Sequence, residues 1–131
     1  MDTVPTRSPS TLLLAVDGSS YSDAEATLVA GIAWPAGTAV RVLAVVPERL
    51  PLLGLSVETQ RMVDESLSNL RQQEWAVAKT LTTHSANRLR AHDLAVEALV
   101  REGRPAEVIL EQAAAMSADL IVIGAKGLSA P

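Results

Sequence analysis

Four short apolar runs, separated by stretches with helical periodicity, constrain the fold of this sequence more than any other feature. The runs are Thr11–Val16, Thr38–Val46, Leu94–Val100 and Asp119–Ile123. Runs with so few polar positions are typical of strands buried on both faces, which occur in parallel sheets covered by helices. Because parallel strands are joined by right-handed helical crossovers, the order β-α-β-α-β-α-β predicts an open parallel α/β sheet with helices on both faces.

Three helices are predicted between these runs. The first begins at the Ser19-Ser20 pair, either member of which can cap it, and ends before Pro35-Ala36-Gly37. The second is long, from about Val57 to Arg90, and the third begins at Pro105, where a first helical turn accepts proline. Apolar residues at helical spacing mark the faces expected to pack on the core. They are Ala24, Ala26, Leu28, Val29, Ile32 and Ala33, then Val63, Leu67, Leu70, Val77, Leu81 and Leu89, then Val108, Ile109, Ala113 and Met116.

The composition narrows the class of protein. The 131 residues suit one domain, which we expect to span residues 11–131 after a flexible polar segment at residues 1–10. A net charge of −4 and very few aromatic side chains disfavour nucleic-acid binding. The absence of cysteine excludes disulfides, thiolate catalysis and cysteine-based metal sites. Leu12–Val16 is far shorter than the roughly 20 apolar residues that span a membrane, so we expect a soluble, cytoplasmic protein.

Two loops at the predicted carboxyl ends of the strands have an unusual composition. In open α/β sheets, ligands bind at these ends, where the strand order reverses. After the first run, Asp17-Gly18-Ser19-Ser20 places a carboxylate at the strand end and hydroxyls at a helix N-terminus, which favours anions. After the fourth run, Gly124 and Gly127 flank Lys126 and let the backbone approach an anion closely. Each loop alone is equally compatible with an ordinary turn, and Lys126 with a solvated surface lysine. Together they indicate a nucleotide or phosphate site.

Other nucleotide-binding and catalytic motifs are missing from the sequence. Lys126 is followed by glycine, which excludes a P-loop, and the solitary Gly18 excludes the dinucleotide-binding motif. The third run ends in Val100-Arg101, which disfavours a response regulator with an aspartate at that position. His84 and His92 are off the spacing of a metal-binding pair and are expected to be solvated. Since no nucleophile elbow is present either, no catalytic set is predicted.

Three segments resemble the universal stress protein family, whose fold is of the adenine nucleotide alpha hydrolase-like type. They are Val16-Asp17-Gly18-Ser19 after the first strand, Arg101–Ile109, and Ala118–Ser129. Their order and spacing agree with the family over about residues 11 to 129, and the C-terminal third is the most specific part. The resemblance implies the strand order 3-2-1-4 and, as in many members, binding of ATP or AMP. It also implies a dimeric stress-response binding module.

The same resemblance assigns binding roles residue by residue. Asp17 would face the adenosine, the backbone of Val45 the adenine, and Gly124 and Gly127 the ribose and phosphates, with Lys126 and Ser129 as additional contacts. ATP is favoured because the first half of the family's phosphate motif, a G-x-x-G, is present. Mg²⁺ is a candidate companion of the phosphates.

The sequence departs from the family pattern at its C-terminal end. The second half of the phosphate motif should begin about ten residues after Gly127, whereas the sequence ends at Pro131. The family's fifth strand, which pairs across the dimer, also follows that motif. We therefore expect an incomplete copy, or one completed by a partner chain. Leu120–Ile123 would then be an open apolar edge that pairs with another molecule, as in a homodimer.

The leading hypothesis is therefore an adenine-nucleotide-binding, regulatory stress-response module that is not an enzyme, beyond weak ATP hydrolysis. The alternative is a member of the same family that binds no nucleotide and acts through protein–protein contacts. An enzyme acting at the α-phosphate is least favoured, because no base or nucleophile is placed for it. The apolar segment Leu50–Leu55 is a candidate partner surface and equally a loop folded over the sheet end.

Overall fold

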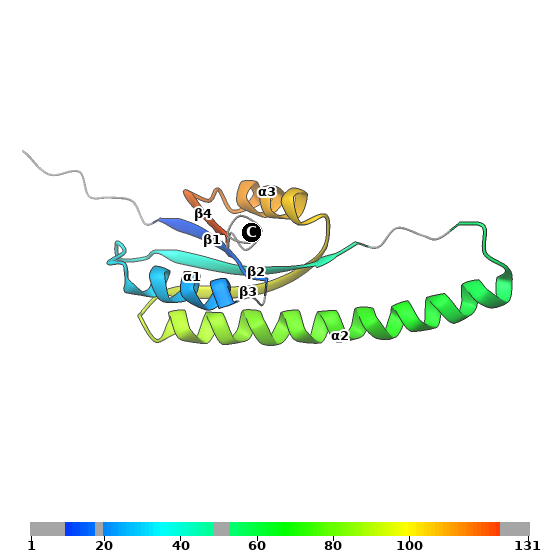
Figure 1. Ribbon diagram of the computed structural model, residues 1–131. Coiled ribbons are helices and arrows are strands. Elements are labelled where there is room, and N and C mark those ends of the chain that lie inside the picture. The colour runs from blue at the N-terminus through cyan, green and yellow to red at the C-terminus, as the bar shows by residue number, and fades with distance from the viewer. Residues whose placement is uncertain (1–9, 18–19, 49–52, 124–131) are drawn as a thin grey trace, which may run out of the picture.

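The computed structural model describes residues 10–17, 20–48 and 53–123 (Figure 1). Strands and helices alternate along these residues as the sequence predicts. They are β1 (Thr11–Ala15), α1 (Ser20–Gly31), β2 (Ala39–Pro47), α2 (Val57–Arg90), β3 (Ala95–Gly103), α3 (Pro105–Ala115) and β4 (Leu120–Ile123). Among the described helices, none combines the length and the apolar character that crossing a lipid bilayer requires.

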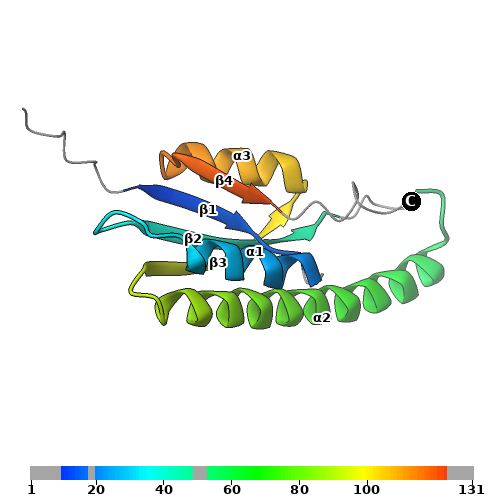
Figure 2. The same ribbon diagram turned by 60° about the vertical axis from the view of Figure 1, so that its left-hand side comes forward.

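The described strands form a parallel sheet in the order β3-β2-β1-β4. This is the predicted order 3-2-1-4. Helices α1 and α2 cover one face of the sheet and α3 covers the other, as Figures 1 and 2 show. The fold is thus the open α/β arrangement expected from the sequence, with helices on both faces.

The core has one layer on each side of the sheet. The layer under α3 contains Leu13, Leu43 and Val108. The layer under α1 and α2 is larger and contains Leu12, Leu14, Val16, Ala26, Val29, Val40, Val42, Ala44, Val46, Ala78, Ala86 and Leu89. Successive side chains of β1 and β2 alternate between the two layers, as they do along any strand. Because both layers are apolar, these strands read as nearly continuous apolar runs.

Helix α1 ends earlier than the sequence indicates and buries fewer of its apolar residues. Its last residue is Gly31, a poor helix former, rather than a residue next to Pro35. The indole N–H of Trp34 donates to the carbonyl of Val29 at 2.8 Å, which satisfies an acceptor in the last turn. Leu28 is 63% exposed, whereas Ala26 and Val29 are buried. Only part of the predicted apolar face of α1 therefore packs on the sheet.

Helix α2 has the predicted bounds but a different buried face. Ser56 caps it by accepting a hydrogen bond from the backbone N–H of Thr59 at 3.2 Å. Its buried residues are Ala78, Thr82, Ser85, Ala86 and Leu89, all in the C-terminal half. The N-terminal half extends past the carboxyl ends of the strands (Figure 2). The sheet is thus too short to bury the whole apolar stripe of this helix.

Strand β3 is longer than expected, because its last residues pair with the end of β2. Val45 lies opposite Arg101 and Pro47 opposite Gly103. The backbone N–H of Glu48 donates to the carbonyl of Gly103 at 3.1 Å, so the pairing continues to the end of both strands. Pro47 is the last residue of β2, a position where proline removes no interior ladder bond.

Candidate functional site

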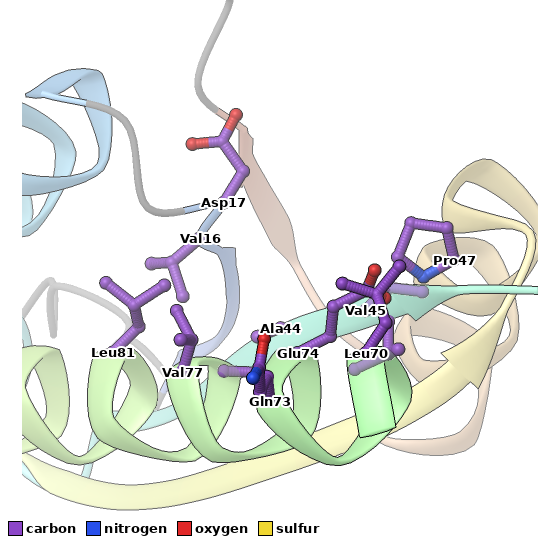
Figure 3. A pocket seen from close by; sticks show the side chains of 12 residues that line it. Val16, Asp17, Ala44, Val45, Pro47, Leu70, Gln73, Glu74, Val77 and Leu81 are labelled. Carbon is purple, nitrogen blue, oxygen red and sulfur yellow. The ribbon is translucent and has the colours of Figure 1, made fainter. Parts of the chain in front are cut away.

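A pocket of about 390 Å³ lies at the carboxyl ends of β1 and β2, against the middle of α2 (Figure 3). Its size is in the range of pockets that hold small molecules. The lining residues come from the end of β1, the end of β2 and one side of α2. They are Val16, Asp17, Ala44, Val45, Val46, Pro47, Leu70, Gln73, Glu74, Val77, Ala78 and Leu81. The pocket therefore lies at the carboxyl ends of the strands, where the sequence predicts a ligand site, on the β2 side of β1; the strand order itself reverses on the other side of β1, next to β4.

Asp17 occupies the rim of this pocket. It follows the buried Val16, whose backbone N–H still donates to the carbonyl of Leu43 at 2.8 Å and so extends the pairing of β1 with β2. Asp17 itself is exposed, and Figure 3 shows its carboxylate pointing away from α2. A carboxylate in this position can accept hydrogen bonds from a ligand that enters over the strand ends.

Val45 presents its backbone to the same opening, because β2 continues beyond the end of β1. The register of β1 with β2 ends at Ala15 opposite Leu43, whose carbonyl points toward β1. Residues two apart in a strand direct their N–H and C=O groups to the same side. The N–H and C=O of Val45 therefore point toward the β1 side of β2, at a level beyond the last residue of β1 that pairs with β2. Together with Asp17, they offer a donor and acceptors at one opening.

The wall of the pocket formed by α2 is mainly apolar, and the sequence predicts a different position for its residues. Leu70, Val77 and Leu81 belong to the stripe predicted to face the core, and all three line the pocket. Leu70 is 39% and Val77 59% exposed. The sequence signal that could have shown this is the length of the helix. Because α2 is longer than the sheet beneath it, part of its apolar stripe is left to line a pocket rather than the core.

Glu25 is a further polar residue near the site, and the sequence analysis missed it. It lies on the inner face of α1 and is 8% exposed, and neither carboxylate oxygen has a hydrogen-bond partner among the described residues. Burial, and after it the negative charge of Asp17, together raise the pKa of the Glu25 carboxyl well above its ordinary value, to about 7. A signal for it exists in the sequence: an acidic residue next to Ala26 and four positions before Val29, both on the apolar face.

The remaining predicted site residues, Gly124, Lys126, Gly127 and Ser129, lie outside the described residues. The last described residue of β4, Ile123, lies opposite Ala15 of β1. His84 and His92 are exposed, as predicted. In the part of the chain that the structure describes, no group of three or more His, Cys, Asp or Glu side chains is arranged to hold a metal ion.

Comparisons with protein families and with solved structures point to the same family. A family model described as "Universal stress protein family" matches residues 10–131. No curated protein sequence matches the chain. Among solved structures, the universal stress protein UspA from Lactobacillus plantarum is 24% identical, with a TM-score of 0.73, over 95% of this chain and 83% of that one.

Two further solved structures of similar fold contain a nucleotide. A universal stress protein family protein from Arabidopsis thaliana with AMP bound is 19% identical, with a TM-score of 0.61, over 92% of this chain and 79% of that one. A universal stress protein in complex with cAMP is 18% identical, with a TM-score of 0.65, over 92% of this chain and 80% of that one. At these identities the likeness establishes a shared fold.

Proposed function

Because the chain belongs to the universal stress protein family, we propose that it binds an adenine nucleotide in the pocket at the carboxyl ends of β1 and β2. The observation that carries the proposal is the meeting of the Asp17 carboxylate and the Val45 backbone at one opening. The AMP and cAMP named in the structures of similar fold support the choice of ligand.

Each part of an adenine nucleotide has a chemically suitable counterpart in the proposed site. The backbone N–H and C=O of Val45 match the donor and acceptor edge of adenine, and the apolar wall of α2 suits its flat ring. Asp17 would accept a hydrogen bond from a ribose hydroxyl or from the adenine amino group. Gly124, Gly127, Lys126 and Ser129 would then contact the ribose and phosphates. This last assignment rests on the family resemblance.

The proposed activity is binding with a regulatory outcome, without efficient catalysis. Asp17 and Glu74 are the ionisable side chains among the described residues that line the pocket, and no Ser-His or Cys-His pair accompanies them. ATP and AMP are both proposed ligands, with Mg²⁺ as a companion of the ATP phosphates. We further propose that the protein acts in the cytoplasm as a homodimer.

The test is calorimetric titration of the purified protein with ATP, AMP and adenosine. We expect AMP to bind, and Asp17→Ala to weaken binding by about 1.5–3 kcal/mol, because a hydrogen bond to a charged acceptor is lost. This corresponds to roughly a 10- to 150-fold higher Kd. Asp64→Ala is the matched control, because Asp64 is exposed, pairs with Gln60 on α2 and does not line the pocket. Unchanged affinity in Asp17→Ala would refute the assignment of Asp17.

A second function, protein–protein contact without nucleotide, is favoured by one observation. The N-terminal half of α2 and the residues before it expose apolar side chains, with Leu53 89%, Val57 86% and Met62 67% exposed. Exposed apolar groups of this kind often mark contact surfaces. If none of the three ligands binds the wild-type protein in the calorimeter, this second function replaces the first.

A further inference from the structure

Glu25 is a buried carboxyl group beside the proposed nucleotide site, and the binding scheme above leaves it without a role. It is 8% exposed, and its helix neighbours Ala26 and Val29 are fully buried. Neither carboxylate oxygen has a hydrogen-bond partner within the described residues. An ionised carboxylate without partners is strongly disfavoured in such surroundings, whereas the neutral acid is tolerated. The environment of Glu25 therefore favours a bound proton.

Among the described residues, no charged group is shown to offset the ionisation of Glu25. Helix α1 packs against β1, β4 and α2. Asp17, which follows β1, brings a like charge, and the described residues of β4 are all apolar. On α2, the guanidinium of Arg88 donates to the hydroxyl of Thr27, and Lys79 and His84 line a different hollow on the exposed side of the helix. Within the part of the chain that the structure describes, the charged group that acts on Glu25 is thus Asp17, the carboxylate at the pocket rim.

We propose that Glu25 is a proton-dependent positioning residue for Asp17, and that nucleotide binds when Glu25 is neutral. This inference rests on the nucleotide site proposed above. In its neutral form, Glu25 has an O–H that can donate toward the Asp17 carboxylate and hold it as an acceptor for the ligand. When Glu25 ionises, it repels Asp17 and adds a second negative charge where an anionic nucleotide must enter.

Thermodynamic linkage gives the direction of the effect. Since the nucleotide binds the protonated form, its affinity falls as the pH rises through the titration of Glu25. By reciprocity, binding near neutral pH takes up protons from solution. A nucleotide with a charged phosphate is affected more than adenosine, which carries no charge.

The experiment is calorimetric titration with AMP and with adenosine at about pH 6 and about pH 8, in buffers of different ionisation enthalpy. The proteins are wild type, Glu25→Gln and the control Glu111→Gln, whose carboxyl is exposed on α3. Wild type should bind AMP about tenfold more weakly at the higher pH and take up protons on binding. Glu25→Gln keeps a neutral donor, so it should bind at both pH values as wild type does at the lower one. Because the phosphate of AMP itself titrates near pH 6, the pH effect is read as the wild-type to variant ratio.

The outcomes separate this inference from the proposed function. Equal pH profiles in wild type and Glu25→Gln, with AMP bound in both, would overturn the role of Glu25 and leave the nucleotide site intact. Failure of wild type to bind AMP at either pH would overturn both. If Glu25→Gln does not fold, carboxyl carbon NMR of the wild-type protein without ligand gives the answer, because Glu25 titrating at an ordinary carboxyl value would refute the inference.

Discussion

Glu25 lies in an environment that opposes its charge, and this links the stability of the protein to pH. The pKa of its carboxyl is about 7 in the folded protein and returns to its ordinary value, near 4.3, on unfolding. Between these values the folded state holds the proton that the unfolded state has released. The free energy of unfolding therefore falls as the pH rises through this window and levels off above it.

We predict that Glu25→Gln stabilises the protein at about pH 8 by up to about 3 kcal/mol and changes its stability little at about pH 4. The physical reason is that glutamine is a neutral isostere of the protonated acid. Urea denaturation at several pH values measures the effect. Glu111→Gln should follow the wild-type curve, and a Glu25→Gln curve that runs parallel to wild type at all pH values would contradict the prediction.

The sequence was informative about single residues only where their role depends on position in the chain. Asp17 and Val45 lie near the ends of β1 and β2, positions that can be predicted because the end of an apolar run is visible in the sequence, and their binding roles stay predictions. Glu25 was missed, because periodicity marks the apolar positions of a helix and does not show that an acidic residue between them is buried as well. Leu70 and Val77 line the pocket instead of the core because the sheet does not extend under this part of α2. Local sequence patterns do not show how far a sheet extends.

At the scale of elements, the turn from β3 into α3 depends on Gly103. Its φ of +150° is unfavourable for a side chain, and a Cβ there would lie 2.8 Å from Cγ2 of Val108, a buried residue of the layer under α3. We predict that Gly103→Ala lowers the free energy of unfolding by about 1–3 kcal/mol, through backbone strain and the displacement of Val108.

Gly31 provides the matched control for this prediction. A Cβ at Gly31 meets nothing within 4 Å, and the residue ends α1. Gly31→Ala should therefore be neutral or stabilise the protein by up to about 1 kcal/mol. Thermal denaturation of both variants gives the comparison. Equal effects of the two substitutions would show that the contact with Val108 is not limiting.

The elements themselves were predictable because each has a local cause. The bounds of α2 agree with the sequence, since Ser56 is a cap and the periodicity is long. The end of α1 at Gly31 and the extension of β3 to Gly103 were not predicted. The first depends on the indole of Trp34 reaching back to Val29, and the second on the length of β2. Both are contacts between segments that sequence patterns do not encode.

At the scale of the whole molecule, β4 is the edge at which we expect association. Among the described strands it pairs with β1 alone, and it exposes 44% of Leu120 and 55% of Ile123. An apolar edge strand with free backbone groups recruits another strand. We predict that the protein is a dimer by light scattering and that Ile123→Lys shifts it toward monomer, because a charge at an edge opposes pairing.

Leu110→Lys is the control for surface charge, because Leu110 is 64% exposed on α3. It should leave the dimer intact. A wild-type protein that remains monomeric at high concentration, or a dimer unaffected by Ile123→Lys, would exclude β4 as the contact.

The stagger between β1 and β2 also bears on how such a site changes over generations. Every amino acid except proline carries the same main-chain N–H and C=O, so most substitutions at Val45 leave a contact made through these groups in place. Related proteins can then differ in the side chain at position 45 and still make the same main-chain contact with the ligand. Loss of this main-chain contact requires a proline at position 45, or an insertion or deletion that shifts β2 relative to β1. Recognition through the main chain of Val45 therefore depends on the register of β2 with β1, and substitutions that keep this register largely preserve it.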